Sequence, residues 1–322
     1  MKKSKLFLGV DGGGTRTTAV VVDENGNILT RCCGDSINYY AVGLDKARVS
    51  MKKIMAKISE DYGIDSFSSA FIGMSALNGR ANEKELKGFV EGVIKSEKIQ
   101  MDSDLFIALE SLAVEGECAV AISGTGSMAI SRAKDGTTEC IGGWGHILGD
   151  EGSGYKIALD AIKAAIHSYE GTLPETELVE AVLNFYEIEK MEDLIDLFYN
   201  PLIEKKRVAA FAIKVKELAQ SGDKTAQEII LKNADDFSKT VLSLLKNYSK
   251  TIKIGLWGGI FTHLSLYSER FKNNLEKNGY ANIGVLEYPP EIGAVFSAMK
   301  LYGLDVNDKA MENMGDNTEE KA

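Results

Sequence analysis

Cysteine and histidine are scarce in this chain of 322 residues, and neither is arranged for a structural zinc site. The four cysteines are Cys32, Cys33, Cys118 and Cys140, with no Cys-x-x-Cys spacing, and none of the three histidines stands at ligand spacing from them. The N-terminus begins with two lysines, but its apolar stretch breaks at Asp11, too early for an export signal. Reduced thiols and the lack of a targeting signal lead us to expect a cytoplasmic protein.

Long apolar runs and surplus positive charge are also missing. The chain has 47 acidic against 37 basic residues, a net charge of −10, whereas a surface that binds nucleic acid needs an excess of lysine and arginine. No apolar run approaches the roughly 18 residues of a membrane span. We therefore expect neither nucleic acid nor a membrane as a partner. Only four prolines occur against 32 glycines, so glycine forms most of the turns.

The length predicts about two domains, since a domain averages roughly 150 residues. A pattern of three strands with a glycine turn after the first occurs twice, about 110 residues apart. The first copy has strands at 6–10, 18–23 and 28–33, and the second at 119–123, 128–133 and 138–141. Although β-meanders in general look alike, the shared order and turn chemistry favour two similar sheets.

The remaining segments alternate between helices and strands, which is typical of an α/β protein. Between the two copies we expect helices at 45–58 and 83–95 and strands at 70–74 and 105–109; later helices at 155–169, 175–186, 192–199, 205–220, 223–248, 266–277 and 291–302; and strands at 252–256 and 285–288. The expected domains are 1–112 and 113–304, with a helical insertion in the second and with the option that its last helix packs back on the first. Residues 305–322 are polar and acidic, which predicts a disordered tail.

The first glycine turn comprises Asp11, Gly12, Gly13, Gly14 and Thr15. It joins two strands and opens no helix, so it is neither a Walker loop nor a Rossmann fingerprint. Glycines in such a hairpin leave backbone N–H groups that form an anion-binding nest. An acid beside a phosphate requires a cation, which makes Asp11 the candidate ligand of Mg²⁺, directly or through water. The alternative is a tight hairpin with a capping aspartate.

The second copy repeats this device with hydroxyl groups in place of the acid, in the turn formed by Gly124, Thr125, Gly126 and Ser127. Two anion-binding turns at corresponding places predict one polyphosphate bound by both. Gly258 and Gly259 follow a later strand, where the lack of side chains admits a flat, bulky group such as a base and its ribose.

Together these motifs resemble the phosphate 1, phosphate 2 and adenosine motifs of the sugar kinase, Hsp70 and actin superfamily. Residues 142–153, GGWGHILGDEGS, are nearly identical to the signature GGWGHxxGDEGS of N-acetylglucosamine kinases, although a glycine-rich connection is the alternative. Over about residues 5–303 the chain is similar to the N-acetylglucosamine kinase branch of the BadF/BadG/BcrA/BcrD ATPase family. The resemblance implies an α/β fold of two similar ribonuclease H-like domains with an ATP cleft between them, ATP and Mg²⁺ as cofactors, and a homodimer.

The resemblance also assigns a sugar site to Asn38, Ser75, Gly143, Trp144 and Asp150. Sugar sites combine an apolar surface with several hydrogen-bonding groups. The indole of Trp144 can cover the pyranose ring or the acetamido methyl group, and Asp150 can accept hydroxyl protons. Asn38 could equally be a turn residue.

The family places its catalytic aspartate at the end of the strand before phosphate 2, followed by a helix. With a strand at 105–109 that position is Glu110, which we expect to act as general base and to contact the sugar. Glutamate is one methylene longer than aspartate, and a misplacement of about 1 Å can cost about 100-fold in rate. A helix-capping role for Glu110 is the alternative.

The predicted function is an ATP-dependent kinase that phosphorylates the 6-hydroxyl of an N-acetylated amino sugar, either N-acetylglucosamine or N-acetylmuramic acid, in amino-sugar metabolism and cell-wall recycling. One alternative is a BadF-type ATPase without sugar-kinase activity, although Cys118 and Cys140 do not resemble the cluster ligands of its electron-transfer relatives. A glucosamine or glucose kinase is another. The sequence does not rank these sugars.

Overall fold

Two five-stranded sheets organise the structure, a computed structural model that describes residues 4–77, 79–112 and 116–315. The strand orders are β3-β2-β1-β4-β5 and β10-β9-β6-β7-β8. Read from its other edge, the second order repeats the first position by position. In both sheets the first strand pairs antiparallel with the second and parallel with the fourth. The predicted internal repeat and the α/β class are confirmed.

Contacts divide the chain into two units, which are described separately. The first unit joins Met1–Glu115 to Leu286–Ala322. Its strands are β1 (Leu6–Gly12), β2 (Arg16–Asp23), β3 (Ile28–Asp35), β4 (Phe67–Met74) and β5 (Ser96–Asp102). Its helices are α1 (Tyr39–Val42), α2 (Leu44–Tyr62), α3 (Glu83–Val90), α4 (Asp104–Glu110), α13 (Pro290–Tyr302) and α14 (Asp308–Gly315).

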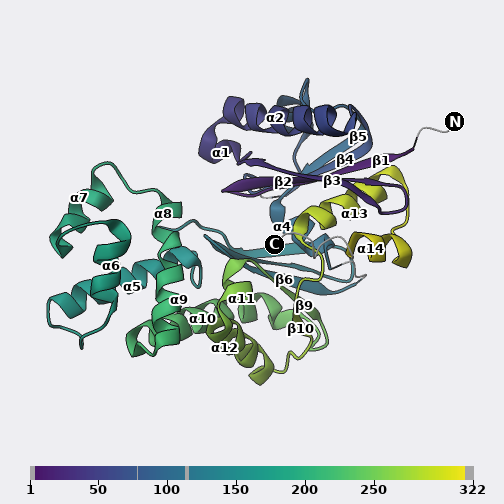
Figure 1. Cartoon of the computed structure of the whole chain (residues 1–322). Coiled ribbons are helices and arrows are strands. Elements are labelled where there is room, and N and C mark those ends of the chain that lie inside the picture. Colours follow the sequence, from purple (N-terminus) through teal and green to yellow (C-terminus); the bar gives the residue numbers. More distant parts are fainter. Residues whose placement is uncertain (1–3, 78, 113–115, 316–322) are drawn as a thin grey trace. The chain divides into compact units, whose positions relative to one another are not determined.

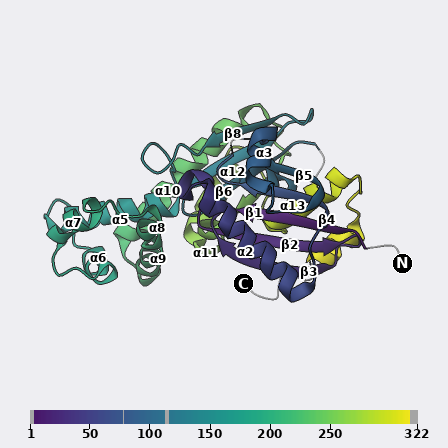
Figure 2. The ribbon, with the colours of Figure 1, turned by 90° about the horizontal axis from the view of Figure 1, so that it is seen from above.

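Helices cover both faces of the first sheet, with α2 on one face and α13 on the other (Figures 1 and 2). Glycines let α13 approach closely. A Cβ atom on Gly9 of β1 would lie 2.6 Å from the backbone nitrogen of Val295, and one on Gly293 would lie 2.7 Å from the backbone nitrogen of Ser111, just after α4. Helix α13 therefore packs directly on β1, the strand that leads into the first glycine turn.

The second unit spans Gly116–Val285. Its strands are β6 (Cys118–Ser123), β7 (Ser127–Arg132), β8 (Thr138–Gly142), β9 (Lys253–Trp257) and β10 (Ile283–Val285). Its helices are α5 (Gly154–Tyr169), α6 (Leu178–Tyr186), α7 (Leu194–Tyr199), α8 (Lys205–Ala210), α9 (Ala212–Ser221), α10 (Lys224–Leu244), α11 (Gly259–His263) and α12 (Ser265–Lys277).

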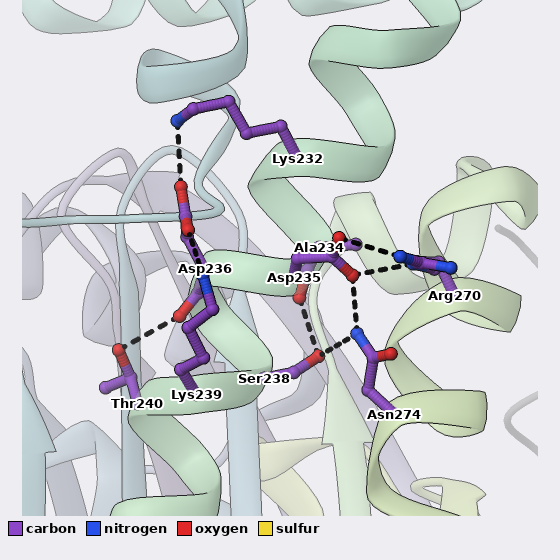
Figure 3. A network of polar contacts seen from close by, with 9 residues as sticks. All are labelled: Lys232, Ala234, Asp235, Asp236, Ser238, Lys239, Thr240, Arg270 and Asn274. Carbon is purple, nitrogen blue, oxygen red and sulfur yellow. Dashed lines mark hydrogen bonds and ion pairs between the residues drawn. The ribbon is translucent and has the colours of Figure 1, made fainter. Parts of the chain in front are cut away.

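A polar network joins α10 to α12 in the second unit (Figure 3). Asp235 accepts hydrogen bonds from Nε and Nη2 of Arg270, at 2.6 and 2.9 Å, and from the amide of Asn274 at 2.6 Å. The same amide donates to Ser238 Oγ at 3.2 Å. These hydrogen bonds hold α10 against α12, and α10 also contacts α5, α9 and strands β7 and β8.

The expected strand at 105–109 is wrong, because these residues lie in helix α4. Ser103 caps the helix by accepting a hydrogen bond from Phe106 N at 3.1 Å. The strand before it, β5 (SEKIQMD), is an edge strand with exposed polar positions, so its sequence lacks the apolar signal of a buried strand. The apolar run that follows reads equally well as a short buried helix.

The disordered tail expected at 305–322 is also corrected. Residues 308–315 form α14, in which Ala310 and Met314 are buried against the core of the first unit. Asn307 begins the helix by accepting a hydrogen bond from Ala310 N at 2.9 Å. Two apolar residues four positions apart are too few to give a clear helical periodicity. Residues 316–322 lie outside the described part of the chain.

The contacts group residues from Leu286 onward with the first unit, whereas the second expected domain extended to residue 304. Within residues 4–77, 79–112 and 116–315, no helix is both long enough and apolar enough to cross a membrane.

Candidate active site

The first glycine turn lies at the end of the β1–β2 hairpin, beyond the pair formed by Gly12 and Thr17. Two serines fix its backbone. Ser36 Oγ donates to the carbonyl oxygen of Gly13 at 3.0 Å, and the Ser75 amide donates to that of Gly12, also at 3.0 Å. Because these two carbonyl oxygens are engaged, the turn is held in one shape by the segments after β3 and β4.

Asn38 and Ser75, the expected sugar contacts of the first unit, meet beside this turn. The amide nitrogen of Asn38 donates to Ser75 Oγ at 2.9 Å, and Ser75 Oγ lies 4.0 Å from where a Cβ on Gly14 would be. Asn38 Oδ1 accepts from the amides of Tyr40 and Ala41, both at 3.1 Å, and so caps α1. Asn38 therefore has the turn role that the sequence left open, while its amide nitrogen faces the glycine turn.

Asp11 lies within electrostatic reach of two other acids of the same unit, Glu291 and Asp104. Burial raises the pKa of Asp11 well above its usual value, the negative charges of Glu291 and Asp104 raise it further, and Arg16 opposes the shift. Asp104, half-buried as the first residue of α4, has a pKa raised by burial to about 6. A pair of carboxylates in a desolvated place is unfavourable without a cation or a bound proton.

Asp104 occupies the position at which the sequence analysis expected the base, directly after the strand and at the start of the helix. The strand is β5, which ends at Asp102, and not the segment 105–109. The placement of Glu110 after a strand was therefore wrong. Glu110 is the last residue of α4, only 6% exposed, and pairs with Lys300 Nζ of α13 at 2.7 Å. This ion pair ties α4 to α13.

The second glycine turn joins β6 to β7 and is closed by a hydrogen bond from Gly124 N to Gly126 O at 2.9 Å. The end of the signature segment 142–153 and the start of α5 pack on it. Ser127 Oγ donates to the carbonyl oxygen of Glu151 at 2.7 Å, and Gly154 N donates to that of Gly124 at 2.7 Å. The start of α5 and the second turn thus form one hydrogen-bonded block.

Asp150 lies against this turn. Its side chain is 4% exposed, and its backbone has φ = 64°, in the left-handed region that few residues other than glycine adopt. Strain of this kind is concentrated at functional sites. Asp150 Oδ1 accepts from Ser127 N at 3.4 Å, and Oδ2 pairs with Lys205 Nζ at 2.7 Å. Sequence reasoning missed Lys205, because nothing in the sequence separates it from its neighbour Lys206.

Gly258, the first glycine of the later pair, also touches the second turn. Gly258 has φ = 105°, and a Cβ atom there would lie 2.7 Å from the carbonyl carbon of Ser123, at the end of β6. Gly259 begins α11. The first glycine is therefore needed for close backbone packing, and the expected contact of this pair with a nucleoside remains a prediction.

The signature loop presents apolar side chains rather than burying them. Trp144, Ile147 and Leu148 are 75, 81 and 78% exposed. Gly143, with φ = 74°, lies so close to Met128 that a Cβ atom would come within 2.6 Å of its sulfur. The loop is therefore anchored at its start and carries an exposed indole, as an apolar platform for a ligand requires.

Each unit thus brings several predicted residues together. The first collects the turn from Asp11 to Thr15 with Asn38 and Ser75, and the second collects the turn from Gly124 to Ser127 with Asp150 and the pair at 258–259. Equivalent glycine turns on two sheets of one topology define a two-domain α/β fold of the actin-like type.

The particular family follows from comparison with known proteins. Residues 8–298 match the BadF/BadG/BcrA/BcrD ATPase family, and the chain belongs to this family. The N-acetyl-D-glucosamine kinase of Dictyostelium discoideum is 29% identical over 314 residues, covering 92% of this chain and 98% of that protein. The N-acetylmuramic acid/N-acetylglucosamine kinase of Clostridium acetobutylicum is 29% identical over 305 residues, covering 91% and 98%.

Solved structures share the fold. A candidate N-acetylglucosamine kinase of Chromobacterium violaceum has a TM-score of 0.75 at 19% identity, over 92% of this chain and 99% of its own. A ROK family glucokinase of Streptomyces griseus, in complex with glucose and AMPPNP, has a TM-score of 0.57 at 17% identity, over the same shares. Membership of this ATPase family supports ATP as the nucleotide of this chain.

Proposed function

We propose that the chain is an ATP-dependent kinase that phosphorylates the 6-hydroxyl of an N-acetylated amino sugar. The two curated relatives, which span nearly the whole chain, are kinases of such sugars. The observation that carries the proposal is the placement of Asp104. It brings a carboxylate with a pKa of about 6 into the unit that holds the first glycine turn and the pair of Asn38 and Ser75.

Asp104 replaces Glu110 as the proposed general base. A base works best when its pKa lies near the working pH, and burial puts that of Asp104 at about 6. In the proposed step, the carboxylate takes the proton of the sugar hydroxyl as its oxygen bonds to the γ-phosphorus. The bond from that phosphorus to the β-bridging oxygen breaks, and its electron pair leaves with ADP. Glu110 is already committed to Lys300.

Asp11 is the proposed ligand of Mg²⁺, directly or through water. The described residues contain no group of three or more His, Cys, Asp or Glu side chains arranged for a metal. Mg²⁺ in kinases needs only one or two carboxylates together with phosphate oxygens. The mutual repulsion of Asp11 and Asp104 fits this need, because a cation would relieve it. When bound, the ion supplies charge neutralisation for the phosphates.

The sugar contacts remain those expected. Asn38 and Ser75 offer an amide and a hydroxyl beside the first turn, whereas Gly143, Trp144 and Asp150 belong to the signature segment of the second unit. We further propose that each glycine turn binds phosphate of the nucleotide. A homodimer, a cytoplasmic location and a role in cell-wall recycling also remain proposals, of which sedimentation of the purified chain tests the first.

ADP release with Mg-ATP, measured across N-acetylglucosamine, N-acetylmuramic acid, glucosamine and glucose, tests the function. We expect release that depends on at least one of the two N-acetylated sugars and is at least tenfold slower with glucose. Release that ignores every sugar would support the alternative of an ATPase without sugar-kinase activity. A preference for glucose or glucosamine would contradict the proposed substrate class but not the kinase.

A further inference from the structure

The ammonium group of Lys205 lies beside Gly126 of the second glycine turn. Lys205 is the first residue of α8, in the helical part of the second unit, and α8 packs on the start of α5. Its Nζ lies 2.7 Å from Asp150 Oδ2. A Cβ atom on Gly126 would lie 3.1 Å from both of these atoms. Glycine at this position therefore leaves room for the ammonium directly over the backbone of the turn.

The electrostatics of this turn require such a cation. Asp150 already occupies the place where the turn would receive an anion, since its carboxylate accepts from Ser127 N. A phosphate arriving beside this carboxylate would be repelled unless the charge were offset. An ammonium carries three donors, and Asp150 takes one of them. The Lys205 side chain is 32% exposed, which leaves its other donors accessible.

The charge of Lys205 also reaches a neighbouring ring. The pKa of His146 is lowered, first by burial and then by the positive charge of Lys205, while Asp150 opposes the shift. The imidazole packs edge-on against Tyr155 at 4.7 Å between ring centres. The ammonium is therefore electrostatically effective beyond its ion pair.

We propose that Lys205 binds the terminal phosphate of the nucleotide at the second glycine turn. This deepens the proposed function, on which it rests: Mg²⁺ offsets the acids beside the first turn, and a lysine offsets the acid beside the second. An alternative source of the same anionic chemistry is the carboxylate of an acid-bearing amino sugar such as N-acetylmuramic acid. The position of the ammonium over Gly126 favours the phosphate.

Equilibrium binding of Mg-AMPPNP and Mg-ADP to the purified chain, without sugar, tests the proposal. A charge-assisted hydrogen bond is worth about 1.5–3 kcal/mol, so Lys205→Met should raise Kd for Mg-AMPPNP about 10- to 100-fold. Kd for Mg-ADP should change less than about threefold, because ADP lacks the γ-phosphate that Lys205 is proposed to bind. Lys205→Arg should recover part of the loss. Lys206→Met, which removes the same charge from the adjacent exposed lysine, should leave both constants unchanged.

Equal effects of Lys205→Met on both nucleotides, or no effect on either, would overturn the proposal, and a melting curve identifies misfolding as a cause of equal losses. Selective loss of N-acetylmuramic acid binding with intact AMPPNP binding would also overturn it and would assign Lys205 to the sugar. Because the nucleotide measurement needs no sugar, it remains decisive even if no sugar in the panel is phosphorylated. Failure of the proposed function and failure of this inference are therefore distinguishable.

Discussion

The two glycine turns occupy the same place on sheets of the same order, yet their surroundings differ in charge. At the first turn, the negative charge of Asp104 is one of the causes that raise the pKa of Asp11. Beside the second turn, the carboxylate of Asp150 is paired with Lys205 Nζ at 2.7 Å. The backbone was repeated and the side chains diverged. At the first turn we propose that Mg²⁺, bound together with the nucleotide, offsets the acidic charge. At the second turn the side chain of Lys205 offsets it.

The largest expected effect comes from removing the acid of the first turn that we propose as base. Asp104→Asn should lower kcat at least about 10³-fold, since general-base catalysis contributes about 10² to 10⁴. Asp45→Asn is a matched control, because Asp45 is an exposed acid in the first turn of α2. Steady-state kinetics with saturating sugar measures both, and a loss below tenfold in Asp104→Asn would rule out the base.

The same substitution should raise stability. The pKa of folded Asp104, about 6, lies above that of the unfolded chain, so its ionisation opposes folding as pH rises through this range. Asp104→Asn should gain about 1 to 3 kcal/mol in free energy of unfolding at pH 8, and nothing below about pH 3, where both states are protonated. Urea unfolding at the two pH values checks this. Equal changes at both would show that charge is not the cause.

Activity should depend on pH in the same range. Below about pH 6 the proton on Asp104 blocks its role, so kcat should fall about tenfold per pH unit. Pre-steady-state rates of sugar phosphorylation between pH 4.5 and 8 measure this acidic limb of the pH–rate profile. A rate that does not change with pH would show that Asp104 does not act as the base in the chemical step.

A methyl group can be added to each end of the second turn to sharpen the comparison. A Cβ on Gly126 would lie 3.1 Å from Lys205 Nζ and Asp150 Oδ2, whereas one on Gly124 would meet nothing within 4 Å. Gly126→Ala should raise KM for ATP about tenfold by disturbing the ion pair, on the order of one hydrogen bond. The effect of Gly124→Ala should be at least threefold smaller. Equal effects would show that the pair does not serve the nucleotide.

The smallest expected effect concerns Glu110, which the sequence analysis expected to be the base, and its ion pair with Lys300. Glu110→Gln removes the partner of Lys300, whose head is half exposed and can be solvated, so we expect a loss of only about 1 to 2 kcal/mol in stability. Activity should stay within tenfold of wild type. Thermal melts of Glu110→Gln, Lys300→Met and the double variant test this; fully additive losses would argue against a direct interaction.

Much of the framework was predictable, because strands bounded by glycine turns leave a clear pattern. The repeat and the two turns follow from this pattern, the long helix α10 follows from its helical apolar period, and Asn38 and Ser75 do lie beside the first turn. Strand β5, which leads to Asp104, was not predicted. Polar edge strand β5 gave no apolar signal, and the apolar run after it was taken for the strand, which moved the proposed base from Asp104 to Glu110.

Long-range pairing explains what else the sequence could not supply. Lys205 is 55 residues from Asp150, and only the fold brings them to 2.7 Å. The unusual φ of Asp150 has no sequence signature either, since the residue is not glycine. The short helix α14 rests on a single pair of buried apolar side chains, Ala310 and Met314, within a polar segment.

Transfer of labelled γ-phosphate from ATP to N-acetylglucosamine or N-acetylmuramic acid, compared among wild type, Asp104→Asn and Glu110→Gln, tests the central claim most directly. We predict transfer by wild type and by Glu110→Gln, within tenfold of each other, and loss of at least about 10³-fold in Asp104→Asn with intact nucleotide binding. Transfer by Asp104→Asn at a rate near that of wild type, or its selective loss in Glu110→Gln, would contradict this account.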